Sequence, residues 1–557
     1  MNHHPRHNKT AIALLAAFLS IVSLASLTPL TRAGTTIITN KDNLASGATA
    51  HVAATYDIGS VGLTLGAGDT LSLGGYVARD GNPNNVPVNI TGNGALVINS
   101  GGVLDLQKAW KNSSDAQGSA QYNIGGALIL NNGGVLNFGA DSTLTSRGYE
   151  AITDALRISV GGNLTLNGGT FTSSANIPQI WLKGATNTIA SSVSVPTVAT
   201  FVLNSANQTL TSGAGLGTVL IRQSSDQTAT LSVTGTNSDG SNVQKIQFYQ
   251  QNSGKTTTLK LGSDIRVNEN ISLAGGPANT AGNTATYTID TNGRKLDMSA
   301  SGSRFEPTRN NTNVATTWNF IGNGGTVEAH SFRFNMNDNV SVNIGAGVTL
   351  IAHANNVTNT LGSQASGSVD ATSTFIYEGA DTTSKSFLNA NIAIGKVVAR
   401  KGTIEASSAL NIQGGLVIEA GGSFSALAYA LTTPSLTFGI DGASFGTISA
   451  TGAVSIADKT LTFDFAAAPA SSTSYTLFTS GATGSADSVS VTFSGLNAIA
   501  LTNSSGVWSA IQDGFTYTFT ESNGILSVAS AIPEPSTVAL IAGVGSVLFV
   551  LIRRRKS

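Results

Sequence analysis

The amino-acid sequence predicts an all-β protein whose main part is a β-solenoid, or β-helix. Apolar and polar residues alternate over short segments such as 163–166 and 229–233, which is the period of a strand with one buried face. Glycine pairs interrupt these segments and supply the positive φ angles of tight corners. A unit of strand, glycine corner and strand recurs along the chain, and long amphipathic helical patterns are absent between the two terminal segments.

The recurring unit is clearest in three closely spaced copies. They cover 94–106, 126–138 and 162–171, and a fourth copy lies far downstream at 414–424. The apolar residues keep their positions in each copy, so that stacked copies would align them in ladders. One copy cannot bury its apolar face alone, whereas a stack lets each copy cover its neighbour. A string of β-sandwiches is the competing architecture, but it would show no recurring glycine corner.

The patterns divide the chain into four segments. These are a signal peptide at 1–33, the solenoid at 34–438, a small C-terminal antiparallel β unit at 439–531, and a sorting segment at 532–557 that contains a transmembrane helix at 538–552. Matches to the repeat fade between 186 and 339, and a distorted solenoid or inserted loops both remain open there. We expect the C-terminal β unit to cover the end of the stack, whose strand edges would otherwise be unpaired.

The N-terminus has the three parts of a secretory signal. Arg6 and Lys9 make a basic start, residues 11–27 form an uncharged apolar run, and small residues precede the predicted cleavage between Ala33 and Gly34. An uncleaved anchor helix is the alternative. The pattern predicts that the chain is exported.

The end of the chain also has three parts. They are the motif Pro533, Glu534 and Pro535, the uncharged run 538–552, and the basic cluster Arg553, Arg554, Arg555 and Lys556. The prolines enforce an extended segment, because each lacks an N–H and restricts the residue before it. As a helix the apolar run would span roughly 22 Å, which is short for a bilayer core of about 30 Å but can be accommodated by snorkelling and local thinning. The basic cluster would stay on the cytoplasmic side, which argues against the alternative of a buried C-terminal helix.

These three parts, in this order, resemble the PEP-CTERM sorting signal of Gram-negative bacteria. The resemblance covers the tail alone. It implies processing near Pro533 to Pro535 by exosortase, a membrane-embedded, transpeptidase-like protease, in a host that makes exopolysaccharide and places such proteins on its surface or in its matrix. The alternating strands with glycine corners also look like autotransporter-associated strand repeats, a looser likeness of texture.

The composition of the body argues against several classes of partner and site. Without the signal peptide and the tail, the body keeps 22 of the 29 basic residues and 29 of the 30 acidic ones, a net charge of about −7. A body with this net charge lacks the excess of positive charge that attracts nucleic acid or anionic lipid. Charged residues are only 11% of the chain, well below the roughly 25% of an average domain. The absence of cysteine excludes cysteine nucleophiles, thiolate metal sites and iron–sulfur clusters.

Histidines are the first candidates for chemistry. The body contains His51, His330 and His353. A solenoid that brought the last two together with Glu328 would assemble imidazole and carboxylate metal ligands. Isolated histidines on the surface or between strands are the simpler expectation, so we predict no metal site.

Three further patterns are candidate sites. Asp264 and Glu269 could act as the two carboxylates of a glycoside hydrolase, but turn residues look the same. Residues 290–293 are a fragment of a cation-binding loop without its later ligands. Residues 213–217 are glycine-rich, but neither a lysine-serine or lysine-threonine pair nor a helix follows, as a phosphate site would require. We therefore predict no catalytic residue and no cofactor.

Binding to sugars is the remaining chemistry. The chain has four tryptophans that could stack on sugar rings or could fill core positions at strand ends, namely Trp110, Trp181, Trp318 and Trp508. A polysaccharide-degrading β-helix would need a local cluster of Asp, Lys and Arg. The nearest is the sparse segment 396–405, with Arg400 and Lys401.

Together these patterns predict an exported structural or adhesive protein, and not an enzyme. We expect it on the cell surface or in the extracellular matrix, anchored transiently or permanently in the membrane by its C-terminal helix. The expected partners are an exosortase-like enzyme, the membrane and exopolysaccharide, with no nucleic acid. The alternatives are a polysaccharide lyase or glycoside hydrolase on a β-helix, and a surface-layer component that assembles with itself.

Overall fold

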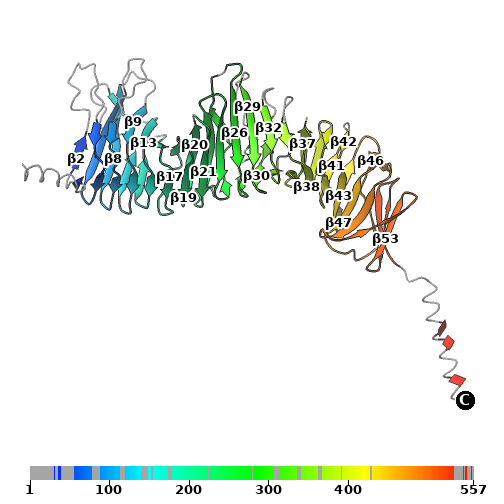
Figure 1. The fold of residues 1–557 in the computed structure, drawn as a ribbon. Helices are drawn as coiled ribbons and strands as arrows, with labels where there is room; N and C mark the ends of the chain where they lie inside the picture. The colour runs from blue at the N-terminus through cyan, green and yellow to red at the C-terminus, as the bar shows by residue number, and fades with distance from the viewer. Residues whose placement is uncertain are drawn as a thin grey trace, which may run out of the picture. The chain divides into compact units, whose positions relative to one another are not determined.

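The structure is a computed structural model that describes most of the body of the chain. The described residues are 30–31, 35–38, 55–77, 88–112, 119–138, 149–151, 155–173, 178–223, 225–278, 280–299, 302, 304–305, 314–334, 340–361, 367–390, 392–426, 430–531, 543–544, 546–547 and 553–554. They divide between two compact units. The first comprises Met1–Val348 with Gly362–Gly367, and the second Thr349–Leu361 with Ser368–Ser557. Figure 1 draws their strands as arrows, coloured from blue near the N-terminus to red near the C-terminus.

The first unit consists mainly of three sheets in which neighbouring strands run parallel. Sheet A contains β1 (Leu30–Thr31), β4 (Leu63–Leu65), β7 (Leu96–Ile98), β10 (Leu128–Leu130), β14 (Leu164–Leu166), β17 (Thr186–Ile189), β19 (Gln208–Ser212), β21 (Gln227–Val233), β23 (Lys255–Leu261), β26 (Thr284–Asp290), β29 (Ala315–Ile321) and β32 (Val340–Ile344). Sheet B contains β2 (Thr35–Ile38), β5 (Thr70–Val77), β8 (Val103–Asn112), β11 (Val135–Phe138) and β15 (Thr170–Ser173), with the antiparallel β12 (Tyr149–Ala151) beside β8. Sheet C contains β3 (Thr55–Asp57), β6 (Val88–Thr91), β9 (Ser119–Ile124), β13 (Ala155–Val160), β16 (Pro178–Leu182), β18 (Thr200–Leu203), β20 (Leu216–Gln223), β22 (Val243–Gln250) and β25 (Ser272–Gly275).

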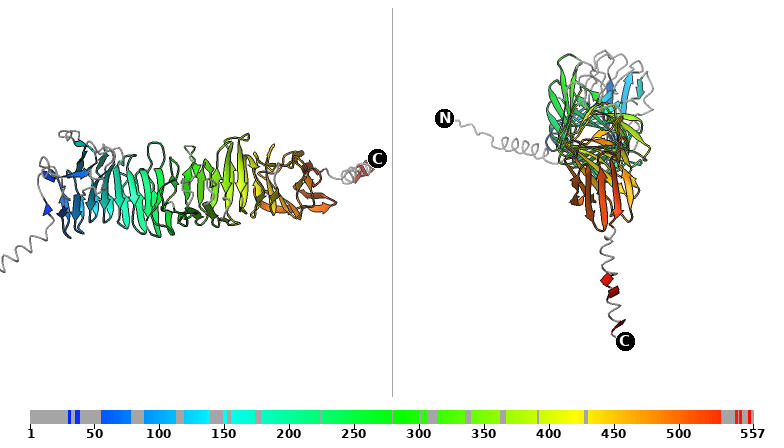
Figure 2. Two further views of the ribbon diagram at one scale, coloured as in Figure 1. Left: turned by 90° about the horizontal axis from the view of Figure 1, so that it is seen from above. Right: turned by 90° about the vertical axis from the view of Figure 1, so that its right-hand side faces the viewer.

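Two shorter sets of strands complete this unit. They are β24 (Ile265–Arg266), β27 (Lys295–Met298) and β30 (Thr326–Ala329), and the pair β28 (Arg304–Phe305) and β31 (Ser331–Phe332). Successive strands lie side by side from blue to green in the left view of Figure 2. Many parallel sheets, each built from strands that are one repeat apart, are consistent with a β-helix.

The predicted repeat sets the register of the first sheets. Leu96, Leu128 and Leu164 pair directly across β7, β10 and β14, and each is at most 1% exposed. They form the aligned apolar ladder that the three copies predicted. The glycine that opens the second copy, Gly126, allows this close stacking, because a Cβ there would lie 1.9 Å from the carbonyl oxygen of Gly94.

An asparagine ladder runs beside these leucines. The Asn131 side-chain amide donates to Asn99 Oδ1 at 2.8 Å, and Asn131 Oδ1 accepts from Asn167 at 2.9 Å. We expect Asn131→Ala to lower the free energy of unfolding by about 1–2 kcal/mol, because both neighbours lose a partner. Urea unfolding measures this. Asn132→Ala is the control, since the exposed Asn132 side chain makes no hydrogen bond within the described residues, and equal losses in the two variants would contradict the ladder's role.

Aromatic side chains fill the core farther along the first unit. Trp318 is fully buried, stacks on Tyr287 with ring centroids 5.0 Å apart, and meets Phe248 and Phe305 edge-on at 5.5 and 5.3 Å. Such pairs add to the apolar area that the rings bury. The indole Nε1–H has no hydrogen-bond acceptor within the described part of the chain.

The second unit continues with parallel strands and ends in an antiparallel sheet. One parallel set contains β33 (Thr349–Ala352), β36 (Thr374–Glu378), β38 (Lys396–Ala406), β40 (Leu416–Ile418), β43 (Ser435–Asp441), β47 (Thr460–Phe465) and β50 (Ser488–Phe493), and another contains β34 (Val357–Leu361), β37 (Lys385–Ala390), the end of β38, β41 (Gly422–Ser425) and β45 (Thr447–Ser449). Short pairs are β39 (Leu410–Asn411) with β42 (Leu431–Thr432) and β46 (Val454–Ser455) with β49 (Ala482–Thr483). The antiparallel strands are β44 (Ser444–Phe445), β48 (Thr473–Thr476), β51 (Leu496–Ala500), β52 (Thr502–Ser504), β53 (Val507–Gln512), β54 (Phe515–Thr520) and β55 (Ile525–Ser530), while β35 (Gly367–Val369) spans the division between the units.

Parallel pairing extends past the boundary that we predicted at residue 438. The buried Leu436, Leu461 and Val489 lie directly across β43, β47 and β50 from one another. Antiparallel pairing takes over from β50 to β51 and in the sheet β48–β55–β54–β53–β52. The antiparallel part is therefore smaller than the unit predicted at 439–531. Alternating apolar residues indicate a buried strand face, but they do not distinguish parallel from antiparallel neighbours.

The two targeting segments lie largely outside the described residues. The end of the predicted signal peptide contributes β1, whose Leu30 pairs with Leu63 of β4. Most of the predicted helix 538–552 is not among the described residues. Within the described part of the chain, no helix has the length and apolar character that a membrane crossing requires.

Candidate functional site

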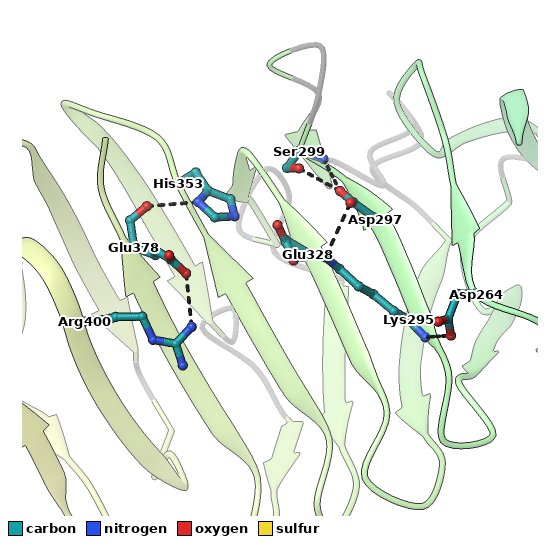
Figure 3. Close-up of polar contacts among 8 residues, drawn as sticks. All are labelled: Asp264, Lys295, Asp297, Ser299, Glu328, His353, Glu378 and Arg400. Atoms are coloured by element: carbon teal, nitrogen blue, oxygen red, sulfur yellow. Dashed lines mark hydrogen bonds and ion pairs between the residues drawn. The ribbon is translucent and has the colours of Figure 1, made fainter. Parts of the chain in front are cut away.

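Charged side chains of the first unit gather on β27 and β30. On these strands Leu296, Met298 and Val327 are fully buried, so that the alternating residues Lys295, Asp297 and Glu328 project from the other face. Asp297 and Glu328 lie directly across the parallel ladder from each other. Figure 3 shows Lys295 between the two carboxylates, at 3.4 Å from Asp297 and 2.6 Å from Glu328.

Hydrogen bonds from neighbouring groups hold the cluster of Lys295, Asp297 and Glu328 in place. Asp264 Oδ1 accepts a hydrogen bond from the backbone N–H of Lys295 at 2.9 Å. Asp297 Oδ1 accepts from the backbone N–H of Ser299 at 2.9 Å and from its hydroxyl at 2.7 Å. Each acidic group therefore has a local donor within the strands or turns.

The lysine amine is held in its charged form. Burial acts to lower the pKa of Lys295, but the hydrogen bond to Glu328 and the negative charges of Asp297 and Glu328 outweigh it and raise the pKa above its ordinary value of 10.5. A general-base lysine needs the opposite shift. This arrangement therefore favours an ion pair that stabilises the sheet over a catalytic base.

We expect Lys295→Met to lower the free energy of unfolding by about 1 kcal/mol at pH 7, since partly exposed pairs are weak and the variant leaves two carboxylates side by side. Because the folded-state pKa is raised, the contribution is complete below pH 10.5 and declines as the pH rises through the folded-state value. Chemical unfolding at several pH values measures this. Lys183→Met is the control, because Lys183 is exposed and forms no ion pair within the described residues. A Lys295 effect that persisted unchanged at high pH would contradict the assignment.

A second charged cluster lies in the second unit, on β36, β38 and the end of β40. Arg400 of β38 pairs with Glu378 at 3.0 Å and with Glu419 at 3.4 Å. His353 Nδ1–H donates to the backbone carbonyl oxygen of Glu378 at 2.9 Å (Figure 3), and Lys401 donates to the carbonyl oxygen of Ala380. The candidate catalytic segment 396–405 thus lies within β38, and its Arg400 is paired with carboxylates.

The other candidate carboxylates also have structural partners. Asp264 accepts the Lys295 backbone N–H, whereas Glu269 pairs with Lys245 at 3.1 Å. Asp290 Oδ1 accepts from the backbone N–H of Asn292 at 3.0 Å in a turn whose Asn292 has φ 49°. These contacts account for all three acids as turn and strand-edge residues.

The remaining candidates separate into core and surface positions. His51 lies outside the described residues, and no group of three or more His, Asp or Glu side chains within the described part of the chain could hold a metal ion. Gly217 packs against its neighbouring strand, since a Cβ there would lie 2.3 Å from the carbonyl oxygen of Ala199. The 213–217 segment therefore serves close strand packing.

The tryptophans occupy different environments. Trp318 belongs to the core, and Trp508 is 8% exposed with its Nε1–H donating to Glu521 at 2.8 Å. Trp110 is described only through its backbone, which pairs with Tyr76 of β5 and with Ala151 of β12. Trp181 lies on β16 and is covered by two arginines of other strands, which the sequence had not indicated as a site.

The sorting residues are described only in part. Arg553 and Arg554 are exposed helical residues, whereas Ala33, Gly34, Pro533, Glu534, Pro535, Arg555 and Lys556 lie outside the described residues. Their assignment as cleavage, sorting and stop-transfer residues stays a prediction.

Comparison with known proteins identifies a family motif in the C-terminal tail alone. Residues 531–556 match the family model of the PEP-CTERM protein-sorting motif. No curated protein and no solved structure matches the chain. The match implies an exported protein that exosortase sorts at the membrane.

Proposed function

We propose that this protein is an exported β-solenoid that serves as a structural or adhesive component of the cell surface or extracellular matrix, in association with exopolysaccharide. The match of residues 531–556 to the sorting motif is the observation that carries the proposal, because it implies delivery through exosortase. The tail would be cleaved near Pro533 to Pro535 after a C-terminal helix had held the chain in the membrane. Autotransporter-like repeats in the body and a Gram-negative host belong to the same proposal.

The body supports a scaffold more than an enzyme. Lys295 and Arg400 are each paired with two carboxylates, which leaves neither cation as a free base or electrophile. Parallel strands, asparagine ladders and aromatic core stacks make each repeat depend on its neighbours. Such a body suits a role that requires persistence outside the cell.

Sorting is tested in the native host with the full chain carrying an internal tag. We expect the native protein at the cell surface or in the matrix, with its last peptide ending near Glu534 by mass spectrometry. Replacement of Pro533, Glu534 and Pro535 together by alanine should retain the uncleaved chain in the membrane fraction. Surface delivery that was unchanged in this variant, or native protein that still carried Lys556 and Ser557 throughout, would overturn the sorting proposal.

The role of the body is tested with matrix polysaccharide from the same host. The full chain in nonionic detergent is incubated with it, and co-sedimentation and new reducing ends or unsaturated sugars are measured in the same sample. Binding without product supports the scaffold. Product formation would overturn it in favour of a polysaccharide-degrading enzyme, and the absence of both would favour self-assembly as a surface layer.

A further inference from the structure

The strands of sheet C carry more basic than acidic residues, although the body of the chain has a net negative charge. Its strands from β6 to β25 contain no Asp or Glu, but they contain Arg157, Arg222 and Lys245. Lys245 is paired with Glu269. Figure 1 labels three strands of this sheet, β9, β13 and β20. The two arginines are therefore the cations of these strands that form no ion pair within the described residues.

The arginines converge on one tryptophan. Arg157 of β13 lies over the Trp181 ring with its guanidinium carbon 3.3 Å from the ring centroid, and Arg222 of β20 lies 4.6 Å from the same centroid. Arg222 also lies 4.9 Å from the ring centre of Tyr249. Gln179 Oε1 accepts the indole N–H at 3.1 Å and so fixes the ring. We define the arginine ladder as Arg157, Trp181, Arg222 and Tyr249.

Within the described part of the chain, no acidic side chain compensates the charges in this ladder. Neither guanidinium forms an ion pair or a side-chain hydrogen bond within the described residues, and the Nε atom of each is buried without an acceptor. The two guanidinium carbons are at most about 8 Å apart, because both lie close to one ring, and like charges at that distance repel. Burial, together with the charge of Arg222, lowers the pKa of Arg157 to about 10. Arg157 thus remains charged at neutral pH beside a second guanidinium, and a bound anion would reduce the repulsion between the two.

The geometry of the arginine ladder favours negatively charged sugars over neutral ones. The guanidiniums lie over the Trp181 ring, which is only 7% exposed, so the indole offers little surface for stacking on a neutral sugar. The partly exposed arginines instead present N–H groups, whose planar fork fits the two oxygens of a carboxylate. Stacking on the aromatic rings holds these forks in place before a ligand arrives.

We infer that the arginine ladder on sheet C is a binding site for the carboxylate groups of an acidic polysaccharide. The identity of the polymer rests on the proposed matrix function, whereas the site itself rests on the two stacked guanidiniums, which have no ion-pair partner among the described residues. Sulfate groups are also oxyanions, and the experiment distinguishes binding to carboxylate groups from binding to sulfate groups.

The test measures binding of the full chain, in nonionic detergent, to immobilised polygalacturonate, dextran sulfate and neutral dextran. We expect binding to polygalacturonate that weakens with salt and no binding to dextran. Arg157→Gln and Arg222→Gln should each raise the Kd for polygalacturonate about tenfold or more, the effect of losing one charge-assisted contact. The lysine variants of both positions should recover part of this loss, since they keep the charge but not the fork.

Arg400→Gln is the matched control, because Arg400 is equally cationic but already paired with Glu378 and Glu419. The Kd of this variant should stay within about twofold of the native value, because the Arg400 guanidinium is already bound by two carboxylates. Circular dichroism and thermal unfolding establish that each variant is folded. Native-like binding by folded Arg157→Gln and Arg222→Gln, equal binding to dextran, or binding to dextran sulfate alone would overturn the inference.

Failure of this inference differs from failure of the proposed function. If the double glutamine variant still co-sediments with the host matrix as the native protein does, the ladder is not the binding site and the matrix role stands. If the native protein binds polygalacturonate through both arginines but ignores its host's matrix, the site stands and the proposed partner is wrong.

Discussion

Replacing Gly126 by alanine should destabilise the first unit by about 4–5 kcal/mol or more, at the extreme end of single-residue effects. The added Cβ would lie 1.9 Å from the carbonyl oxygen of Gly94 and 2.8 Å from its carbonyl carbon. Both are backbone atoms that cannot rotate away, so the neighbouring repeat must shift. The Gly126 carbonyl oxygen also accepts from Gly162 N–H at 2.9 Å, and that shift would pass to the next repeat. Urea unfolding and limited proteolysis of the full chain measure the loss.

Gly66→Ala is the control for this prediction. Its Cβ would meet Asp69 Oδ2 at 3.7 Å, an ordinary contact, and Gly66 does not adopt a positive φ. We expect a change within about 0.5 kcal/mol. Similar stability of the Gly126 and Gly66 variants would show that the repeats are not packed as closely as described.

Trp318→Ala should lower the free energy of unfolding by about 3–5 kcal/mol. The substitution opens a cavity among Phe248, Tyr287 and Phe305, whose rings contact the indole on several sides. These side chains lie on β22, β26 and β28, which belong to three different sheets, and each strand is held by its own parallel neighbours. The cavity therefore has little freedom to collapse. Denaturant unfolding, followed by circular dichroism because the variant loses a tryptophan, measures the effect.

Trp318→Phe separates packing from hydrogen bonding. It keeps a ring in the stack and removes an indole N–H that is buried without an acceptor within the described part of the chain. Its loss should therefore be well below that of alanine, at about 1–2 kcal/mol. A phenylalanine variant as unstable as the alanine variant would indicate that Nε1–H has a partner after all.

Local sequence patterns predicted the early repeats well. Glycine corners and alternating leucines placed Leu96, Leu128 and Leu164 in one ladder, and the structure pairs them directly. The prediction worked because these repeats reuse the same residue types at the same positions. Backbone stacking then follows from the identical spacing of strand and corner.

The repeat fades after residue 186 because polar side chains take over inward positions. Asn187 and Gln208 are fully buried, and their amides bond to the backbone of neighbouring repeats. Asn187 Oδ1 accepts from Leu164 N–H at 2.9 Å, and Gln208 Nε2 donates to the carbonyl oxygens of Leu182 and Gly184 at 2.9 and 2.8 Å. A buried amide satisfies backbone groups, but it interrupts the apolar alternation from which strands are predicted.

The arginine ladder lay beyond sequence reasoning for a different reason. Arg157 and Arg222 come from strands separated by β16 and β18, so their meeting over Trp181 depends on strand register. A change of one residue in register would turn either arginine to the opposite face. The tail required no such knowledge, because its three parts are contiguous in the chain.

The nearest-neighbour pairing makes the length of this protein adjustable. β10, β11 and β13 each lie between two strands whose registers match across them: β7 and β14, β8 and β15, and β9 and β16. Excision of residues 126–161 would bring those outer strands together with Leu96 opposite Leu164, and duplication of the same segment would insert one more layer. Gene duplication or loss in whole repeats could therefore lengthen or shorten the molecule without requiring a new fold.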